Sequence, residues 1–460
     1  MNTALLERTD GVLAALRDVL PHGCVDTSSP ALAAARRDES GFVSDADPVC
    51  VVFAETTEHV VATVQIAQRF SAPIVARGAG TGLTGASMGT AGEIVLNLSR
   101  MNRILGIDTE NQVAHVEAGL INGDFNAELV KQGYWFAPDP ASRDISSVGG
   151  NIATNAGGLM CAKYGVTRES VLGLTVVLAD GTVITPGRRT AKGVTGFDLT
   201  SLFVGSEGLL GIITEATVRI LPVPQGRTVT LSAYFDDVNS AASCATQISS
   251  RGLTPLVMEL MDSACLSAVH EHLGLPQSTP HAAHLLIQIQ EADPTEAVAA
   301  AQLTCEQNGA HKVIFAEGAD AEQLLLIRRS VHPALAAQGT TLIEDVCVPR
   351  SELAAMFATI ASIASKYDLY IPTVSHAGDG NLHPNFVFAG PEVPEVVWTA
   401  ANEIFTAALD LGGTLTGEHG VGMLKKRWLK DELGDRQFEL QQQIKELFDP
   451  HNLLNPGKVF

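Results

Sequence analysis

Basic residues are scarce in this chain. Lys and Arg together number 30, against 51 Asp and Glu, so the formal net charge is −21. A surface of that sign repels nucleic acid and anionic lipid. We therefore expect no nucleic-acid partner, and an anionic substrate needs a local cationic site that works against the overall field.

Paired cysteines are absent as well. No C-x-x-C pair occurs, and the seven cysteines are scattered at positions 24, 50, 161, 244, 265, 305 and 347. The odd number and the wide spacing argue against a disulfide framework and against a zinc site built from cysteines. A reducing compartment fits this pattern best.

Long apolar runs are missing too. No uncharged stretch is long enough to cross a bilayer. Residues 1–20 mix charged side chains such as Glu7 and Asp10 with leucines at helical spacing, which is typical of an amphipathic helix and not of a signal peptide. We expect a soluble, cytoplasmic protein that is at most peripherally attached to a membrane.

The length and the composition indicate a globular protein of several domains. Hydrophobic residues make up 46% and charged residues 18% of 460 residues, which is too long for one ordinary core. The pattern of strands, helices and turns predicts an α+β fold. We expect a helical segment at 1–45, a first domain at 46–223, a second domain at 224–412 and a C-terminal segment at 413–460.

The two domains differ in the expected order of their strands, helices and turns. In the first, short strands alternate with glycine turns, and Thr57 can cap a helix that runs to residue 70. Its expected strands are 49–53, 73–76, 93–98, 104–108, 113–118, 174–179, 182–185 and 211–221. In the second, strands alternate with amphipathic helices, which predicts a sheet covered by helices. Its strands are expected at 228–234, 284–290, 312–315 and 341–346, and its helices at 238–249, 295–308, 321–337 and 351–366.

A glycine-rich loop between Arg77 and Gly85 indicates phosphate binding. Glycine permits positive φ and lets backbone N–H groups approach an anion closely. Gly80, Gly82 and Gly85 fit the G-x-G-x-x-G pattern of a Rossmann loop, but a strand follows where that motif needs a helix. We therefore reject a Rossmann site and retain phosphate binding, with a plain multi-glycine turn as the alternative.

Three later segments, 138–158, 163–165 and 203–214, are rich in glycine, small residues and asparagine. Such residues let the main chain lie flat against a large planar ligand and donate hydrogen bonds to its carbonyls and phosphates. Any one of them could be an ordinary turn. Their joint order indicates a cofactor site.

Histidines and a carboxylate mark a third candidate site. His376 and His383 flank a Gly-Asp-Gly loop, and Glu418 and His419 lie in a second glycine-rich stretch. Two histidines with one carboxylate can hold a divalent metal and leave positions open for water or substrate. In isolation the spacing is weak, since histidines in loops more often hydrogen-bond to backbone carbonyls.

With these motifs the chain resembles two families over nearly its whole length. Residues 46–222 are similar to the PCMH-type FAD-binding domain of the vanillyl-alcohol oxidase superfamily. The remainder is similar to the FAD-linked oxidase C-terminal domain of the group formed by D-lactate dehydrogenase, the glycolate oxidase subunit and D-2-hydroxyglutarate dehydrogenase. The resemblance implies a FAD domain of two α+β subdomains, a substrate (cap) domain with an antiparallel sheet, and a C-terminal helical segment that returns to the FAD domain and completes the active site.

The resemblance also implies which residues hold FAD, with the pyrophosphate on the 77–85 loop. They are Arg77, Gly78, Ala79, Gly80, Thr81, Gly82, Leu83, Pro138, Asp139, Ser146, Gly149, Gly150, Asn151, Thr154, Asn155, Gly157, Gly158, Tyr164, Gly165, Glu207, Gly208, Gly211, Ile212 and Ile213. The 77–85 loop contains no His or Cys, so we expect FAD to be bound without a covalent link.

By the same resemblance, a metal and a substrate share the third site. The implied metal ligands are His376, His383 and Glu418, with zinc or manganese as the ion. Arg328 and Asn385 are implied to bind the substrate, and His419 to contact it and to act as the catalytic base. An arginine suits a carboxylate because it can donate two parallel hydrogen bonds.

The chain departs from hydroxyglutarate enzymes at His332 and Ile343, where that group has a hydroxyl residue and a lysine for the second carboxylate. We therefore expect oxidation of a small D-2-hydroxy monocarboxylic acid, such as D-lactate or glycolate, to the 2-oxo acid by hydride transfer to flavin. The alternatives are a D-2-hydroxyglutarate dehydrogenase and the catalytic subunit of a multi-subunit glycolate oxidase.

Readings from other classes are a metal-dependent hydrolase, a non-redox FAD protein and an electron-transfer subunit. The sequence does not identify the electron acceptor, for which a quinone, a cytochrome, an electron-transfer flavoprotein and oxygen are all open. It does not decide whether the chain forms a homodimer.

Overall fold

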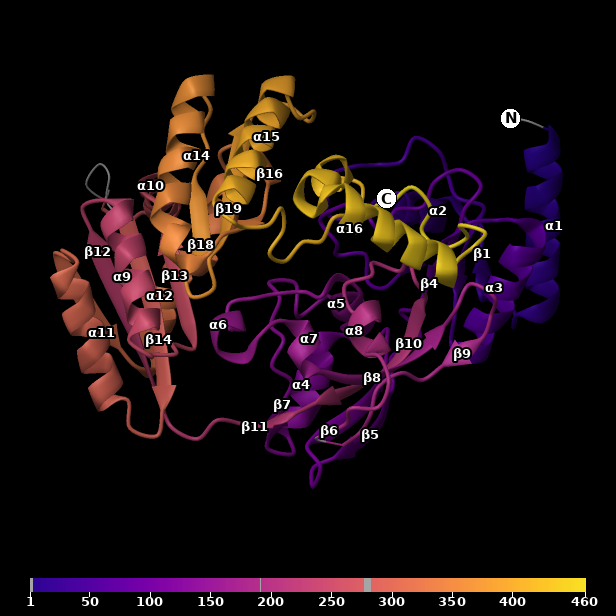
Figure 1. Ribbon diagram of the computed structural model, residues 1–460, viewed down its shortest axis with the longest axis horizontal. Coiled ribbons are helices and arrows are strands. Elements are labelled where there is room, and N and C mark those ends of the chain that lie inside the picture. Colours follow the sequence, from indigo (N-terminus) through magenta and orange to yellow (C-terminus); the bar gives the residue numbers. More distant parts are fainter. Residues whose placement is uncertain (1–2, 191, 277–282) are drawn as a thin grey trace. The chain divides into compact units, whose positions relative to one another are not determined.

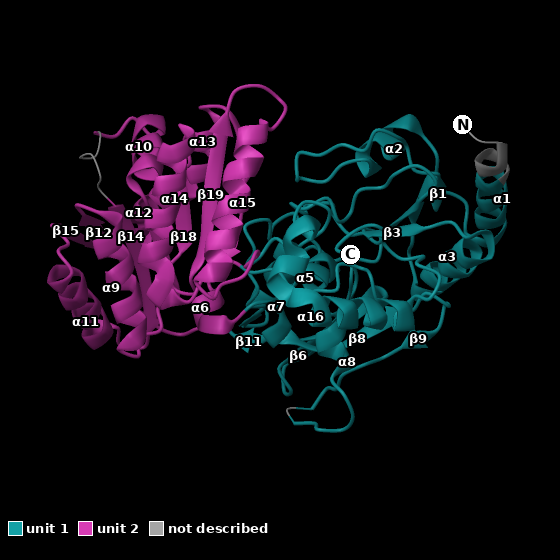
Figure 2. Ribbon diagram, turned by 45° about the horizontal axis from the view of Figure 1, so that its top comes forward, with its two compact units in different colours: residues 1–157, 166–223, 418–460 teal, residues 158–165, 224–417 magenta. Residues whose placement is uncertain are grey.

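The structure is a computed structural model that describes residues 3–190, 192–276 and 283–460. It divides into two compact units (Figure 2). Unit 1 comprises Met1–Gly157, Val166–Val223 and Glu418–Phe460, and unit 2 comprises Gly158–Gly165 and Pro224–Gly417. Both units mix helices with sheets, as the sequence predicts (Figure 1).

Unit 1 contains a small, mainly parallel sheet, in the order β1-β2-β4-β3. Its strands are β1 (Val25–Asp26), β2 (Cys50–Phe53), β3 (Ile74–Arg77) and β4 (Ile94–Asn97). The paired strands β2, β4 and β3 run parallel, and β1 is antiparallel to β2. The helices of this part are α1 (Thr3–Val19), α2 (Ser29–Ala35) and α3 (Thr57–Phe70). Helices α1 and α3 pack on each other and bury apolar faces that include Val12, Leu16, Val60 and Val64.

The second part of unit 1 is an antiparallel sheet in the order β5-β6-β10-β8-β9. Its strands are β5 (Ile104–Asp108), β6 (Val113–Glu117), β8 (Val171–Val177), β9 (Val183–Ile184) and β10 (Ile212–Arg219). Strands β5 and β6 form one antiparallel hairpin and β8 and β9 another, and Gly181 takes the positive φ of +83° that the turn of the second hairpin needs. The helices here are α4 (Asn122–Val130), α5 (Val148–Thr154), α7 (Thr167–Ser170) and α8 (Leu199–Phe203), and the short strands β7 (Tyr134–Trp135) and β11 (Leu221–Pro222) pair with each other.

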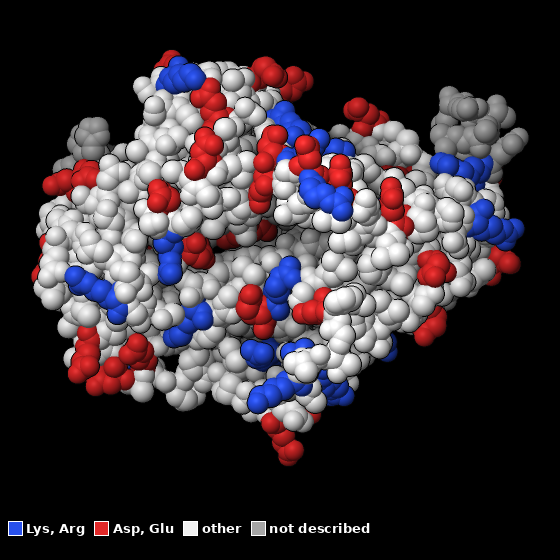
Figure 3. All heavy atoms as spheres, viewed as in Figure 1, with Lys and Arg blue, Asp and Glu red and all other residues white. Residues whose placement is uncertain are grey.

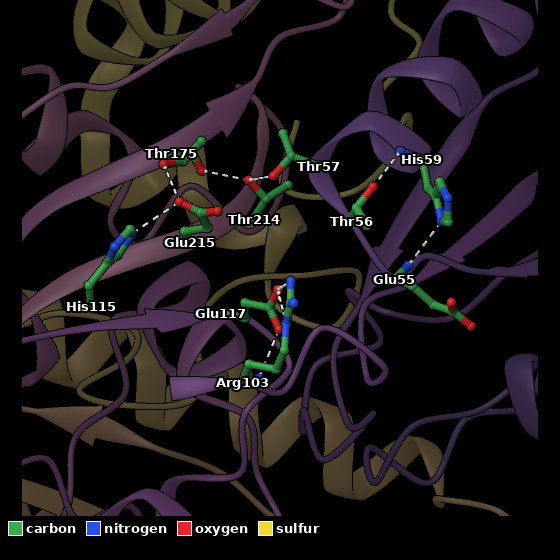
Figure 4. A network of polar contacts seen from close by, with 10 residues as sticks. All are labelled: Glu55, Thr56, Thr57, His59, Arg103, His115, Glu117, Thr175, Thr214 and Glu215. Atoms are coloured by element: carbon green, nitrogen blue, oxygen red, sulfur yellow. Dashed lines mark hydrogen bonds and ion pairs between the residues drawn. The ribbon is translucent and has the colours of Figure 1, made fainter. Parts of the chain in front are cut away.

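The start of α3 differs from the expectation. The capping side chain is that of Thr56, whose hydroxyl accepts from His59 N at 3.3 Å, and not that of Thr57. Thr57 already lies inside the helix, and its hydroxyl donates to Thr214 Oγ1 on β10 at 3.0 Å (Figure 4). The helix thus begins one residue earlier than the motif suggested, and Thr57 connects it to the antiparallel sheet.

The C-terminal segment returns to unit 1, as predicted. It contains helix α16 (Lys426–Phe448), which Gly434, with φ 69° and ψ 166°, interrupts. Near its end, the buried Lys445 donates to Leu209 O at 2.9 Å and to Leu454 O at 2.8 Å, and it pairs with Asp449. Leu454 then forms a parallel bridge with Ile74, so the segment extends the edge of the parallel sheet.

Unit 2 is built on one antiparallel sheet in the order β15-β12-β14-β13-β18-β19-β16, with β17 also paired to β19. Its strands are β12 (Arg227–Phe235), β13 (Val257–Met261), β14 (Ala283–Glu291), β15 (Lys312–Ala316), β16 (Thr340–Ile343), β17 (Val346–Cys347), β18 (Thr373–His376) and β19 (Asn381–Phe388). The expected strand at 341–346 is therefore two short strands separated by Glu344 and Asp345. Both of these acidic side chains are buried.

The helices of unit 2 form two groups. One consists of α9 (Val238–Ser250), α11 (Thr295–Gln307), α14 (Leu353–Tyr367) and α15 (Glu395–Asp410), and the other of α10 (Ser263–His272), α12 (Gly318–Arg329) and α13 (Val331–Ala336). The short helix α6 (Cys161–Tyr164) and the 3-10 turn η1 (Arg350–Glu352) complete the unit. The helix expected at 321–337 is split at Ser330, three residues before Pro333, which cannot donate a helical hydrogen bond.

The surface carries its charges in mixed order. On the face shown in Figure 3, acidic and basic side chains are interspersed over both units, and the basic ones form only small groups. Throughout the residues that the structure describes, no helix is long and apolar enough to cross a membrane.

Candidate active site

A cavity of about 490 Å³ lies in unit 1 between the glycine-rich segments. It is lined by the loop after β3, by α5 with the residues before it, by the turn before β10, and by three residues of the C-terminal segment: Glu418, His419 and Asn455. The predicted cofactor residues that line it are Arg77, Gly78, Ala79, Gly80, Thr81, Gly82, Leu83, Gly149, Gly150, Asn151, Thr154, Gly157, Glu207, Gly208, Gly211, Ile212 and Ile213.

Seven other predicted cofactor residues are not among those lining this cavity. Pro138, Asp139, Ser146 and Asn155 lie in unit 1 near the lining segments, and Gly158, Tyr164 and Gly165 belong to unit 2. Ser146 and Asn155 have structural contacts instead. The hydroxyl of Ser146 accepts from Asn151 Nδ2 at 3.0 Å, and Asn155 caps the C-terminus of α5 with a left-handed φ of 52°.

Two glycines show why the cavity wall needs residues without a side chain. A Cβ on Gly78 would collide with the hydroxyl of Ser147, and one on Gly149 would lie 2.8 Å from Ala118 O and even closer to the Ala118 methyl group. The 77–85 loop can therefore lie directly against the start of α5. Gly82 is different, because the nearest atom to a Cβ there is Asp38 Oδ2 at 3.6 Å. The surrounding chain thus leaves room for a side chain at Gly82.

Arg77 supports the loop through its side chain. Its guanidinium donates to Arg37 O at 2.7 Å and to Ser87 O at 3.0 Å, so it fastens the loop at both ends. Burial lowers the pKa of Arg77, while Asp38 and Glu39 oppose that shift. Arg77 still lines the cavity, where its positive charge favours an anionic ligand.

Glu207 has a role that the sequence did not reveal. Its carboxylate accepts from Val421 N and from Gly422 N, each at 2.8 Å, and its own N–H donates to Ala153 O at 2.8 Å. Burial raises the pKa of Glu207 to about 7, although the two N–H donors and Lys425 act in the opposite direction. Glu207 therefore links α5 to the loop that carries His419.

The sequence reasoning also missed Asn455. Its Nδ2 donates to Glu207 O at 2.6 Å and to Ala86 O at 3.3 Å, and its backbone takes a left-handed φ of 45°. Among the described residues, its buried Oδ1 has no hydrogen-bond partner, so it can accept from a ligand in the cavity that Asn455 lines. The only signal in the sequence was an Asn-Pro-Gly turn near the end of the chain, which by itself suggests no ligand.

In unit 2, the predicted metal and substrate residues gather on one face of the sheet. His376 on β18 is the cross-strand partner of Glu259 on β13, and His383 on β19 is the partner of Val374 on β18. Cross-strand partners, and residues two apart on one strand, point to the same face. The two imidazole rings meet edge to face, with their centroids 5.1 Å apart.

The face continues to Asn385 and Ile343, which are cross-strand partners on β19 and β16. The side-chain nitrogen of Asn385 donates to Pro372 O at 3.1 Å and to His383 O at 2.8 Å. These two bonds fix the orientation of the side-chain amide. The apolar Ile343 lies directly beside it.

A buried carboxylate connects this face to Arg328 on α12. Glu259 is fully buried, and its Oε2 accepts from Arg328 Nε at 2.6 Å, while its Oε1 contacts His376 Nδ1 at 2.7 Å. Burial alone would raise the pKa of Glu259, but His376 and Arg328 together hold it below its usual value. The glutamate is thus ionised, and it balances the charge of the arginine.

Two residues of the candidate site follow directly after unit 2 in the chain. Gly417, the last residue of unit 2, donates its N–H to Asp345 Oδ1 at 3.0 Å, and Thr416 donates to Asp345 Oδ2 at 2.6 Å. Glu418 and His419 come next and line the cavity of unit 1. A Cβ on Gly157 would lie 2.8 Å from Glu418 Cγ, so this glycine makes room for the glutamate.

The fold and the glycine-built cavity define a flavoenzyme. The family of the FAD binding domain matches residues 48–187, and the family of FAD linked oxidases, C-terminal domain, matches residues 224–459. The chain therefore belongs to the FAD-linked oxidases, and it is an oxidoreductase that binds FAD.

Its relatives include one protein from Bacillus subtilis and one from Archaeoglobus fulgidus, and both match over most of their length. The chain is 41% identical to the glycolate oxidase subunit GlcD of Bacillus subtilis, over 90% of this chain and 89% of that protein. It is 36% identical to a D-lactate dehydrogenase of Archaeoglobus fulgidus, over 90% of this chain and 92% of that protein.

Solved structures show the same fold at low identity. p-Cresol methylhydroxylase with substrate bound matches with a TM-score of 0.79 and 17% identity, over 100% of this chain and 97% of that one. The 4-ethylphenol oxidase of Gulosibacter chungangensis matches with a TM-score of 0.78 and 17% identity, over 98% and 97%. The two-part FAD domain that the sequence suggested is thereby confirmed.

Proposed function

We propose that this chain oxidises a small D-2-hydroxy monocarboxylic acid, such as D-lactate or glycolate, to the 2-oxo acid. The observation that carries the proposal is the single sheet face of unit 2, which presents His376, His383 and Asn385 next to an arginine paired through Glu259. This face combines a cationic group for a carboxylate with polar groups for a hydroxyl. The names of the relatives, glycolate oxidase subunit and D-lactate dehydrogenase, point to the same substrates.

The apolar neighbour of Asn385 favours a monocarboxylic acid over D-2-hydroxyglutarate. Ile343 is partly buried on the same face and offers no charge or hydrogen bond to a second carboxylate. His332, next to α12, has its pKa lowered by burial and by Arg328, so it is neutral at pH 7 and supplies no second cation. A methyl group or a hydrogen at the far end of the substrate suits such surroundings better than a carboxylate.

We assign the carboxylate of the substrate to Arg328. One edge of its guanidinium is engaged by Glu259 through Nε. This bond does not use the two terminal nitrogens, which can donate two parallel hydrogen bonds to a carboxylate. Asn385 would add a contact from its side-chain oxygen to the substrate hydroxyl, since its nitrogen is already used.

The donors of this face fit a divalent metal. His376 engages Glu259 through Nδ1, which fixes the tautomer that leaves Nε2 as the ligand atom, an arrangement common in metal sites. Two histidines and a carboxylate are ligands that suit zinc or manganese, and we propose His376, His383 and Glu418 for this role. When bound, such an ion lowers the pKa of a hydroxyl group that it coordinates.

His419 is the residue that we propose as the base. It lies in the segment that Glu207 fastens through Val421 and Gly422, and it lines the cavity that we assign to FAD. There it takes the proton of the substrate hydroxyl, the commonest catalytic role of histidine. Bound FAD supplies the two-electron acceptor for the chemistry.

The test is anaerobic reduction of the purified flavoprotein by a panel of D- and L-2-hydroxy acids. We expect bleaching of the oxidised flavin spectrum by D-lactate or glycolate, weaker bleaching by D-2-hydroxyglutarate, and none by L-lactate. A flavin that none of these acids reduces would contradict the proposal. A preference for D-2-hydroxyglutarate would show that Ile343 does not set specificity.

A further inference from the structure

One buried carboxylate contacts both the arginine and the first histidine of the candidate site. Glu259 lies in the middle of β13, a strand whose five residues are all buried. Its two oxygens are divided between two donors: Oε2 accepts from Arg328 Nε at 2.6 Å, and Oε1 is 2.7 Å from His376 Nδ1. The side chain of Arg328 is 17% exposed and that of His376 is 8% exposed, so neither bond is open to bulk water.

The contacts leave little freedom to either partner. Each donor has one acceptor in Glu259, and the short cross-strand distance between β13 and β18 fixes His376 relative to the carboxylate. Bonds between charged groups are stronger than neutral ones, and a desolvated setting strengthens them further. These bonds engage His376 through Nδ1 and Arg328 through Nε, so a metal would be bound by His376 through Nε2 and a substrate carboxylate by Arg328 through its terminal nitrogens.

A purely structural ion pair would explain why Arg328 contacts Glu259. It would not explain why the second oxygen of Glu259 contacts His376. Arg329, the next residue on α12, shows the alternative, since it pairs with Glu322 on the surface with both side chains about 60% exposed. Arg328 instead contacts Glu259 on the sheet, a fully buried carboxylate that also contacts a histidine. The same group therefore sets the position of two functions at once.

We infer that Glu259 is a positioning residue that couples the metal site to the binding of the substrate carboxylate. It fixes the tautomer and the ring orientation of His376, and it holds the guanidinium of Arg328 with its terminal nitrogens toward the ligand. This inference rests on the proposed function. It adds that the metal and the substrate carboxylate are oriented through one shared acceptor, so that a change at Glu259 affects both.

The test replaces Glu259 by glutamine, which keeps the shape of the side chain and removes its charge. Its oxygen can accept from one of the two donors, while its NH2 group faces the other donor with a second N–H. The FAD-loaded protein is stripped of metal by chelation and titrated with Zn²⁺ and with Mn²⁺ against a competing chelator. We expect Glu259→Gln to weaken metal binding by about 10- to 100-fold, the usual effect of losing such a partner, and to raise the KM for D-lactate.

Two further variants separate positioning from loss of structure. Asp262→Asn removes another buried carboxylate, at the end of the same strand, which accepts from Cys265 N and Thr373 N at 2.8 Å each. We expect it to lower the thermal stability and to leave metal affinity unchanged. Glu259→Asp keeps the charge, but its shorter side chain withdraws the carboxylate from both donors. If Glu259→Gln does not fold, Glu259→Asp provides the test, and we expect it to weaken metal binding and raise the KM by less than Glu259→Gln would.

The outcomes are distinct. Wild-type protein that binds neither ion would overturn both the metal site and the role of Glu259. Wild-type binding that is lost in His376→Ala but equal in Glu259→Gln and Glu259→Asp would overturn the role of Glu259 alone. An equal loss of affinity in Asp262→Asn and Glu259→Gln would show general loosening of the sheet and would also overturn it. Weakened metal binding together with a raised KM, both specific to Glu259, supports the coupling.

Discussion

The two units carry candidate sites that differ in how they are built. In unit 1 the wall of the cavity is main chain, brought close by glycines such as Gly78 and Gly149. In unit 2 the site is a row of side chains on one sheet face, oriented by the buried Glu259. A wall of backbone suits a large flat cofactor with many acceptors. A row of side chains suits a small substrate that has to be recognised by a few strong contacts, and the difference predicts which function each substitution will affect.

The largest effect should come from His419, the residue of unit 1 that we propose as the base. We expect His419→Ala to slow flavin reduction by D-lactate or glycolate by about a hundredfold to ten-thousandfold, the usual contribution of a positioned base. FAD should stay bound, because the cavity wall is otherwise unchanged. Single-turnover reduction followed in a stopped-flow instrument measures this, and His311→Ala, an exposed histidine that pairs with Asp236, is the control. A near-normal rate in His419→Ala would remove it from the mechanism.

Arg328 should show the next largest effect, and its neighbour provides the matched control. Arg328→Lys keeps the charge but loses the planar pair of donors, so we expect kcat/KM to fall by about 10- to 150-fold, the equivalent of a charge-assisted hydrogen bond of roughly 1.5–3 kcal/mol. Arg329→Lys alters an exposed pair with Glu322 and should leave kcat/KM within about twofold. Steady-state kinetics on both variants make the comparison, and equal kinetics would place the substrate carboxylate elsewhere.

Glu207 should make the free energy of unfolding depend on pH. Its folded pKa of about 7 lies above the ordinary value of 4.5, so the folded state binds the proton more tightly than the unfolded state. The stabilisation of the folded state by the raised pKa of Glu207 is therefore present in full below pH 4.5, and it is lost as the pH rises to about 7. We expect this to lower the free energy of unfolding by about 2–3 kcal/mol across that window.

Glu207→Gln cannot titrate and should lack this contribution, which denaturant unfolding of both proteins at several pH values will show. Asp262, whose pKa burial also raises to about 7, is present in both proteins, so only their difference is informative. A difference that does not change between pH 4.5 and pH 7 would contradict the assignment.

The smallest expected effect tests the backbone wall itself. Gly82→Val places a side chain where the chain leaves room, since only Asp38 Oδ2 lies near, at 3.6 Å. We therefore expect the fold to tolerate it and FAD affinity to fall by about tenfold, which is about 1.4 kcal/mol, through overpacking against the ligand. Flavin fluorescence titration of the apoprotein measures the affinity. Unchanged FAD affinity in a folded variant would show that the ligand does not approach Gly82.

The same difference explains what the sequence could predict. Glycine loops are visible in a sequence, so the cavity wall at Gly78–Leu83 and around Gly149 was found correctly as a group that lies together. The strand β13 was missed, because all five of its residues are buried and no alternation of polar and apolar residues marks it. With it Glu259 was missed, since a lone glutamate among apolar residues gives no hint of the two partners that tertiary pairing brings to it.

Contacts across long sequence separations were equally invisible. Glu207 was assigned to the cofactor from its motif, yet its carboxylate is engaged by Val421 and Gly422, more than two hundred positions later. Asn455 gave no usable signal, because its function depends on where the chain returns and not on its neighbours. By contrast His376, His383 and Asn385 were predicted together, and the strand pairing does bring them to one face.

The return of residues 418–460 to unit 1 has a consequence for biosynthesis. Residues 1–223 contain most of the cavity wall, but Glu418, His419, Asn455 and the Ile74–Leu454 bridge come only after the whole of unit 2 has been made. At about 5–20 residues per second, translation of the intervening stretch takes roughly ten to forty seconds. During that time the edge strand β3 lacks its bridge to Leu454, while every residue of unit 2, Gly158–Gly165 and Pro224–Gly417, has already been made. We therefore expect a newly made chain to bind FAD only after residues 418–460 have been added, because three of the residues that line the cavity belong to that segment.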